Sequence, residues 1–403
     1  MNRQTNAPEQ DASGRWVGAM TLCHTNLARF AIRYDNQTLR TAVRINVGGT
    51  AVRVRVSNRY GRDTLQIGAA AVAISDARGV PGTDPVPLLF NGMPWVRLNP
   101  GEERLSQAAA LTVRPGDWVS VDLHLPGRGR LYSGNLFPLY HRLSDEGMQV
   151  GETHFRARHS FLVRGLSQRL LPVPVAVFSG LDVWTDTAAQ AVVAFGDSIT
   201  ALNQWTGPLA DRLIQEYPGQ LALLNQGISG NRLRYDSANT LARGIYGPAG
   251  VLRFEKDVLS QSGVSTVITL IGVNDLLQPG LTAPREQEAD AESLIDGMRA
   301  LIHLSHMEGV RILGGTITPF GGYLLTHTPE REKVRQTVNH WIREGHEFDG
   351  IIDFDAAIRD PVRPERITDG WHLGDRLHPN AQGGKMMAAL VDPDLLLKPR
   401  ITP

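Results

Sequence analysis

The chain has 403 residues, of which 42% are hydrophobic and 20% are charged, so it is long enough for two domains and too apolar to be disordered. Basic and acidic residues number 41 each, and this balance gives no overall field that would attract nucleic acid or an anionic membrane. The single cysteine, Cys23, excludes an internal disulfide and a cysteine-based zinc site.

The start of the sequence carries no targeting signal. The first fifteen residues are polar and lack the apolar run of a secretory leader, and no later apolar stretch is long enough to span a bilayer. We therefore expect a cytoplasmic protein, or a secreted one if an export signal has been removed from this sequence. Residues 1–14 are expected to be disordered.

Residues 15–186 have the pattern of an all-β domain. Alternating runs are separated by turn-forming Gly, Pro, Asn and Asp at intervals of 8–12 residues, which is typical of an antiparallel sandwich. The clearest runs are Ala42–Val47, Ala51–Ser57, Ala69–Ser75 and Trp118–Leu125. We predict a β-sandwich, jelly-roll-like, that serves as a lid or packing partner, in preference to an independent sugar-binding module.

Charge also separates the two parts of the chain. Residues 1–186 contain 21 arginines, no lysine and 15 acidic residues, whereas the remainder has 20 basic and 26 acidic residues. The opposite net charges would favour docking of one part on the other.

Residues 187–403 alternate strands with helices. This order predicts βαβ units and a parallel sheet covered on both faces. The expected strands are Ala191–Phe195, Leu221–Leu224, Val264–Ile271, Val310–Leu313 and Gly350–Phe354; the expected helices are Pro208–Tyr217, Arg285–His306, Arg331–Arg343 and Asn380–Leu390.

Polar clusters follow three of these strands, and a fourth precedes the last helix. They are Gly196–Thr200, Asn225–Asn231, Gly272–Asp275 and Gly374–Pro379. In an open α/β sheet, ligands bind at the carboxyl ends of the strands, so the four clusters should converge at one edge.

The residue types in these clusters suit acyl transfer. A serine hydroxyl such as that of Ser198 becomes nucleophilic when a histidine takes its proton, and His378 can do so near neutral pH. Asp375 lies three residues before His378 and can hold the imidazole in the required tautomer. The backbone amides of Ser198 and Gly230 and the side-chain amide of Asn274 are candidate oxyanion donors. Each feature alone is typical of a turn or a helix cap, but together and in this order they predict a catalytic site.

The four blocks resemble those of the SGNH, or GDSL, hydrolase superfamily. Gly-Asp-Ser at Ser198, Asn-x-Gly-x-x-Gly at Gly230, Gly-x-Asn-Asp at Asn274 and Asp-x-x-His at Asp375 and His378 match its motifs in order. A looser similarity, in the Asn-Arg-Leu at 231–233 and in Thr316–Phe320, points to the xylan-esterase-like branch with a β-rich N-terminal domain.

The resemblance implies a flavodoxin-like three-layer α/β/α domain and a two-step acyl-enzyme mechanism without metal or other cofactor. The implied substrates are short-chain acyl esters, acetyl esters above all, of small molecules or carbohydrates. Asp197, Asn231 and His372 lie beside the matching residues in the sequence, and we expect them to contact the substrate.

Three other interpretations stay open at this point. Metal-dependent hydrolysis would use Asp197, Asn274, Asp275, Asp369, His372 and His378 as ligands, although no compact ligand motif is present. A carbohydrate-binding protein would have kept the fold and lost turnover. An acyltransferase would use the same triad with an acceptor other than water.

Overall fold

The computed structural model describes residues 14–28, 31–135, 140–156, 162–164, 170–172, 177–237, 244–324 and 326–398. The segment 1–14, which the sequence predicts to be disordered, lies outside these residues except for Gly14. The chain divides into two compact units: unit 1 comprises residues 1–189 and 218–222, and unit 2 comprises residues 190–217 and 223–403. No helix within the described ranges is long and apolar enough to cross a membrane.

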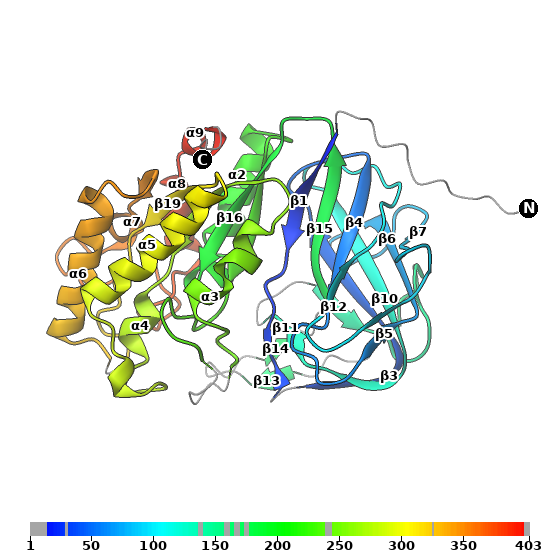
Figure 1. Ribbon diagram of the computed structural model, residues 1–403, viewed down its shortest axis with the longest axis horizontal. Helices are drawn as coiled ribbons and strands as arrows, with labels where there is room; N and C mark the ends of the chain where they lie inside the picture. The colour runs from blue at the N-terminus through cyan, green and yellow to red at the C-terminus, as the bar shows by residue number, and fades with distance from the viewer. Residues whose placement is uncertain are drawn as a thin grey trace, which may run out of the picture. The chain divides into compact units, whose positions relative to one another are not determined.

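Unit 1 is built from antiparallel strands (Figure 1). One sheet has the strand order β1-β15-β4-β9 and the other has the order β12-β3-β10-β6-β7, with the pairs β2/β11, β5/β8 and β13/β14 outside them. These sheets confirm the predicted all-β region. The strands are β1 (Arg15–Thr21), β2 (Thr25–Asn26), β3 (Ile32–Arg44), β4 (Ala51–Ser57), β5 (Leu65–Ile67), β6 (Ala69–Ser75), β7 (Val86–Pro87), β8 (Val96–Leu98), β9 (Glu103–Leu105), β10 (Trp118–Leu131), β11 (Ser133–Gly134), β12 (Tyr140–Leu143), β13 (Leu162–Arg164), β14 (Leu170–Pro172) and β15 (Phe178–Thr185).

Alternation of side chains explains why these segments form strands. In β4, the fully buried Val52, Val54 and Val56 alternate with the partly exposed Arg53 and Arg55. Successive side chains of a strand point to opposite faces, so this pattern places one face of β4 in the core. The predicted limits of β4 and β6 agree with the structure. Strand β10 extends past its predicted end to Leu131, and β3 spans Ile32–Arg44 where Ala42–Val47 was predicted.

The longest ladder joins β3 to β10 and contains a buried ion pair. Arg40 of β3 lies directly opposite Asp122 of β10, and their side chains are 2% and 3% exposed. Nε and Nη2 of Arg40 donate to the two carboxylate oxygens at 2.7 and 2.6 Å. The N–H of Gly151 donates to the same carboxylate at 2.7 Å. The charges are therefore paired and hydrogen-bonded, as burial requires.

Unit 2 contains the predicted parallel sheet, with the strand order β17-β16-β18-β19-β20. Numbered within this unit, the order is 2-1-3-4-5, which is that of flavodoxin-like folds. The chain passes from β16 to β17 on one side and then crosses to β18 on the other, so a crevice opens between the carboxyl ends of β16 and β18. The strands are β16 (Gln190–Gly196), β17 (Leu221–Gly227), β18 (Val264–Leu270), β19 (Arg311–Gly315) and β20 (Gly350–Ile352).

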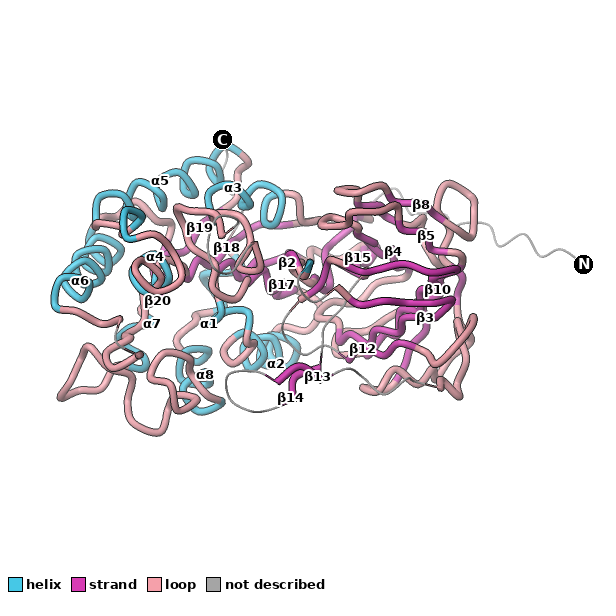
Figure 2. The backbone as a smooth tube through the Cα atoms, turned by 90° about the horizontal axis from the view of Figure 1, so that it is seen from below, coloured by secondary structure: helices cyan, strands magenta, loops and turns pink. Residues whose placement is uncertain are grey.

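Helices cover both faces of this sheet, which confirms the three-layer arrangement. Helices α3 and α5 lie on one side and α2 and α8 on the other (Figure 2). Helix α5 also packs on α3 and α6, while α8 packs on α2 and α7. The helices are α1 (Ser198–Ala201), α2 (Thr206–Glu216), α3 (Gly250–Phe254) with a π-helical extension (Glu255–Leu259), α4 (Val273–Leu277), α5 (Ala291–Met307), α6 (Pro329–Glu344), α7 (Phe354–Ile358), α8 (Ala381–Ala389) and α9 (Pro393–Leu397), with a 3-10 turn at Arg285–Gln287.

Among the predicted boundaries in unit 2 that differ from the structure, two differ because an aspartate caps a helix. The helix predicted from Arg285 begins at Ala291, where the Asp290 carboxylate accepts the N–H of Ser293 at 2.8 Å. The strand predicted to reach Phe354 ends at Ile352, because Asp353 caps α7 instead. An Asp side chain satisfies one of the unpaired N–H groups of a first helical turn and so fixes where the helix starts.

The buried ion pair of unit 1 gives the first prediction. Replacing Asp122 with Ala leaves the Arg40 guanidinium buried without its carboxylate, and we expect the free energy of unfolding to fall by about 3–5 kcal/mol. Urea denaturation of the full chain measures this loss.

The same ladder offers a matched control. Asp35 lies opposite Arg128 and accepts its Nε–H at 2.8 Å, but these side chains are 60% and 85% exposed. Asp35→Ala should therefore cost about 0–1 kcal/mol. Equal losses for the two variants would contradict the role given to burial.

Candidate functional site

The carboxyl end of β16 carries the candidate nucleophile. The strand ends at Gly196, where an added Cβ would lie 2.4 Å from the carbonyl oxygen of Leu270 in β18, so the close approach of the two strands requires glycine. Asp197 then caps α1, its carboxylate accepting the N–H of Ile199 at 2.9 Å. Ser198 is the first residue of α1, and its Oγ lies 2.8 Å from Nε2 of His378.

His378 is fixed from its other side by Asp375. Nδ1 of His378 and Oδ2 of Asp375 are 2.5 Å apart, and Oδ1 of Asp375 accepts the N–H groups of Leu377 and His378 at 3.0 Å each. Burial alone would raise the pKa of Asp375, but the hydrogen bonds and the charge of His378 outweigh it and lower the pKa to about 2. The carboxylate therefore stays charged where an imidazolium needs stabilising.

The loop that carries Asp375 is closed by His372. Nδ1 of His372 accepts the N–H groups of Gly374 and Arg376 at 3.0 and 3.2 Å. Arg376 has a φ of +64°, a left-handed conformation that costs a non-glycine residue free energy and is held here by the surrounding hydrogen bonds. His372 thus supports the turn between Asp375 and His378.

The second cluster brings Gly230 beside the start of α4. Gly230 has a φ of +73°, and an added Cβ would lie 2.5 Å from the ring of Tyr246, so only glycine fits. Its carbonyl accepts a hydrogen bond from Nε2 of Gln278 at 2.6 Å, while its N–H donates to no other described residue. Nδ2 of Asn274 donates to the carbonyl of Asn231 at 3.1 Å, which leaves its second N–H without an acceptor among the described residues.

A buried arginine that the sequence analysis missed joins these segments. Arg253 is 1% exposed, and its guanidinium donates to the carbonyls of Gly196 and Gln226 at 2.8 and 2.9 Å. Its Nε donates to Oδ1 of Asn231 at 2.8 Å. One side chain therefore connects the ends of β16 and β17 to the loop after Gly230. In the sequence, Arg253 and Asp257 are spaced as an ordinary exposed i,i+4 pair, which gives no sign of this role.

Two buried carboxyl groups lie close to the segments that carry Ser198 and Gly230. The carboxylate of Asp275 accepts the N–H groups of Leu233 and Arg234 at 2.7 and 3.0 Å and so fixes the chain beyond Gly230. Burial raises the pKa of Asp275 to about 6 and that of Asp197 to about 7. Both environments favour the neutral form, in contrast to that of Asp375.

The three residues expected to contact substrate have hydrogen-bond partners within the chain. Asp197 is 1% exposed and caps α1, and His372 holds its own loop. Asn231 is fully buried, and its Nδ2 donates to the carbonyls of Tyr246 and Pro248 at 2.8 and 2.7 Å. Polar side chains next to a buried motif have to be hydrogen-bonded, and these contacts meet that requirement.

Two tyrosines that the sequence analysis did not select border the site. The ring of Tyr323 meets His378 edge to face, with ring centroids 6.5 Å apart. Burial, the charge of Asp375 and the proximity of Tyr246 raise the pKa of Tyr323. Tyr246, whose ring lies against Gly230, is therefore close enough to Tyr323 to act on its pKa.

Metal-dependent hydrolysis would require several ligand side chains to lie together. Among the residues that the structure describes, no group of three or more His, Cys, Asp and Glu side chains could hold a metal ion. Of the candidate ligands, Asp369 is paired with the Arg363 guanidinium at 3.0 Å.

Comparisons with known proteins agree with the four-block pattern. Residues 194–386 match the GDSL-like Lipase/Acylhydrolase family. The match begins in β16 and ends in α8, so it includes Ser198, Gly230, Asn274, Asp375 and His378. Comparison with curated proteins gives no match.

Several solved structures are similar to about half of the chain. The acetylxylan esterase Axe2 from Geobacillus stearothermophilus is 20% identical, with 52% of this chain and 94% of that chain covered and a TM-score of 0.39. A GDSL-like lipase from Bacteroides thetaiotaomicron is 16% identical, with 51% and 88% covered and a TM-score of 0.38. LAE5, an alpha/beta hydrolase enzyme from the metagenome of Lake Arreo in Spain, is 20% identical, with 52% and 97% covered and a TM-score of 0.39.

The family match, the parallel sheet and the order of the four blocks lead to the same assignment. Residues 194–386 of this chain form an ester-hydrolase domain of the GDSL-like lipase/acylhydrolase family.

Proposed function

We propose that the chain is a serine esterase that hydrolyses short-chain acyl esters, acetyl esters above all, with Ser198 as nucleophile. The observation that carries this proposal is the continuous hydrogen-bond chain from Ser198 Oγ to His378 Nε2, at 2.8 Å, and from His378 Nδ1 to Asp375 Oδ2, at 2.5 Å. The first distance is within reach of direct proton transfer from Ser198 to His378, and the second joins the imidazole to the carboxylate that orients it.

The proposed reaction has two steps. His378 takes the Ser198 proton as Oγ attacks the ester carbonyl, and the resulting imidazolium gives that proton to the departing alcohol. Water then attacks the acyl-enzyme with His378 again as base, which restores Ser198. Asp375 holds the Nδ1–H tautomer and stabilises the imidazolium in both steps.

Charge develops on the carbonyl oxygen in each tetrahedral intermediate. We assign its stabilisation to the N–H of Ser198, the N–H of Gly230 and Nδ2 of Asn274. The second N–H of Asn274 and the N–H of Gly230 have no acceptor among the described residues, as a preorganised oxyanion hole requires.

The alcohol part of the substrate is proposed to be polar, with a carbohydrate ester as the favoured class. Tyr246 and Tyr323 border the site with rings that carry hydroxyl groups, and such side chains combine an apolar face with hydrogen-bonding capacity. A sugar offers the same combination. The looser resemblance to xylan-esterase-like sequences supports the same class.

Asp197 differs from Asp375 in that burial favours its neutral form. It lies close enough to His378 to interact with its charge, yet burial raises its pKa to about 7. With Asp275 also shifted to about 6, Asp375 is the strongly ionised carboxylate of the site at mildly acidic pH. The imidazolium is then stabilised mainly from the side that keeps the correct tautomer.

Replacing Ser198 with Ala tests the nucleophile. We expect hydrolysis of p-nitrophenyl acetate to be abolished while the circular dichroism spectrum and the melting temperature are unchanged, because only one oxygen is removed. Ser260→Ala, at an exposed serine of the same unit, is the control and should keep full activity. Turnover by Ser198→Ala would exclude Ser198 as nucleophile.

The same assay with the unchanged enzyme tests the substrate class. In a series from acetate to palmitate, kcat/KM should be greatest for acetate and should fall as the acyl chain lengthens.

Adding sugar alcohols as acceptors distinguishes the hydrolase from an acyltransferase, since a transferase would form the acylated sugar in place of free acid.

Replacing Asn274 with Ala tests the oxyanion assignment. We expect kcat to fall about 10²–10³-fold, because the lost donor would act mainly on the charge of the transition state. Steady-state kinetics with p-nitrophenyl acetate separates kcat from KM. A rise in KM with kcat unchanged would assign Asn274 to ground-state binding instead.

Replacing Asp197 with Asn tests the neutral carboxyl through stability. The pKa of Asp197 rises on folding, from 3.8 to about 7. The neutral carboxyl therefore adds to the free energy of unfolding below pH 4, and this contribution is lost as pH rises to 7. The stability of Asp197→Asn relative to wild type should therefore increase from pH 4.5 to 7 and level off above it. Urea unfolding at several pH values measures this difference.

Asp290→Asn is the matched control, because Asp290 also caps a helix. Hydrogen bonds from Ser293 lower the pKa of Asp290, so its contribution is lost only as pH falls below 3.8. Between pH 4.5 and 8 its variant should show no such trend. Parallel curves for the two variants would contradict the buried-carboxyl interpretation.

A further inference from the structure

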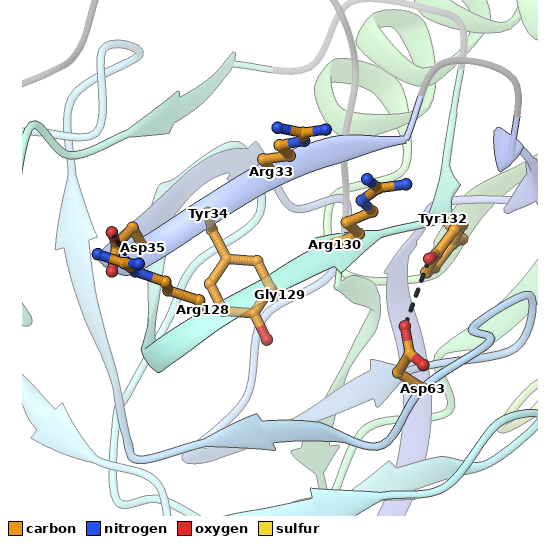
Figure 3. Close-up of a pocket in the computed structure, with 8 residues that line it drawn as sticks. All are labelled: Arg33, Tyr34, Asp35, Asp63, Arg128, Gly129, Arg130 and Tyr132. Carbon is orange, nitrogen blue, oxygen red and sulfur yellow. Dashed lines mark hydrogen bonds and ion pairs between the residues drawn. The ribbon is translucent and has the colours of Figure 1, made fainter.

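Unit 1 contains a pocket of about 690 Å³ at the ends of β3 and β10 (Figure 3). Pockets of this size commonly hold small-molecule ligands. The lining residues all belong to unit 1 and include none of the proposed catalytic residues: Arg33, Tyr34, Asp35, Asp63, Arg128, Gly129, Arg130 and Tyr132.

A bulge in β10 shapes this end of the ladder. The register shifts between Leu125 and Arg128, and the next pairs are Arg128 with Asp35 and Gly129 with Tyr34. An added Cβ on Gly129 would lie 2.4 Å from the hydroxyl oxygen of Tyr34, so the tyrosine can lie against β10 only because residue 129 is glycine. Bulges of this kind redirect side chains and occur frequently beside binding sites.

The polar groups of the pocket include the carboxylate of Asp63 and the phenols of Tyr34 and Tyr132. The hydroxyl of Tyr132 donates to Oδ2 of Asp63 at 3.3 Å. Burial and the charge of Asp63 raise the pKa of Tyr34, so the same carboxylate also acts on the second phenol. Asp63 is exposed and has further lone pairs that can accept hydrogen bonds from ligand hydroxyls.

Two arginines of the pocket lie directly opposite each other in the ladder. Arg33 of β3 pairs with Arg130 of β10, and neither guanidinium has a hydrogen bond or ion pair with another described residue. Like charges at facing positions destabilise a sheet. At another facing position of the same two strands, Arg40 lies opposite Asp122. A negative charge therefore fits opposite an arginine in this ladder.

We propose that this pocket binds an acidic saccharide, that is, a sugar chain with both hydroxyl and carboxylate groups. The hydroxyls would donate to Asp63 and to the phenol oxygen of Tyr132, whose own hydrogen is donated to Asp63, and a uronate carboxylate would lie between the guanidinium groups of Arg33 and Arg130. A small anion without hydroxyls would be repelled by Asp63, and a neutral sugar would leave the facing arginines unpaired. Guanidinium groups bind carboxylates through paired hydrogen bonds, which matches this pair.

The test measures binding and does not depend on ester hydrolysis. The full chain carrying Ser198→Ala is screened against a panel of glucuronate- and galacturonate-bearing oligosaccharides and against the same oligosaccharides with methylated carboxyls. Binders are then measured by isothermal titration calorimetry. We expect at least one acidic oligosaccharide to bind at least tenfold more tightly than its methylated form.

Variants locate the site. In the same Ser198→Ala background, the double change Arg33→Gln and Arg130→Gln should weaken binding of the acidic oligosaccharide tenfold or more. Because it removes a facing pair of like charges, it should leave the melting temperature unchanged or raise it. Asp63→Asn should weaken both the acidic and the methylated forms. Arg78→Gln, at an exposed arginine of unit 1 outside the pocket, is the control and should bind as before.

Three results would overturn the proposal: no binding by any acidic member of the panel, equal binding of the acidic and methylated forms, or binding unaffected by the double arginine change. None of these results bears on the triad, which is tested separately by turnover of p-nitrophenyl acetate in the chain with Ser198 intact.

Discussion

The hydrolase unit depends on one buried guanidinium. The proposed nucleophile follows β16 and the proposed oxyanion donor at Gly230 follows β17, so the two groups belong to segments more than thirty residues apart in the sequence. Arg253 donates to the carbonyl of Gly196, to that of Gln226 and to the side chain of Asn231, which ties both strand ends together. The fork of an arginine is planar and rigid, so it fixes directions as well as distances. No apolar side chain could satisfy those carbonyls below the surface of the site.

Around this frame, the same side-chain type takes on different electrostatic roles. Burial favours the neutral form of Asp197 and Asp275, although each accepts backbone hydrogen bonds. Asp375 is less enclosed and is bonded to an imidazole, which lowers its pKa to about 2. The three residues are all aspartates, so it is the environment of each that decides whether its carboxyl carries charge.

Sequence patterns predict the parts of this protein that follow periodicity and motif spacing. The parallel sheet, its covering helices and the catalytic candidates Ser198, Asp375 and His378 were all accessible in this way, because strand ends converge in a doubly wound fold. Arg253, Tyr246 and Tyr323 were not, since their roles come from tertiary contacts and no local pattern distinguishes them. The outer halves of β3 and β10 were also missed: charged residues, Pro126 and Gly127 interrupt the apolar alternation there, and the pocket of unit 1 lies in that region.

The proposed base and its carboxylate lie in a loop that is closed by its own hydrogen bonds. The N–H of Leu373 bonds to the carbonyl of His378, that of Asn380 bonds to the carbonyl of Trp371, and the Asn380 side chain bonds to Gly370. The serine and the oxyanion donors instead depend on long-range contacts within the sheet. Replacements in this loop would therefore displace the proposed base and its carboxylate while leaving in place the contacts that position Ser198, Gly230 and Asn274.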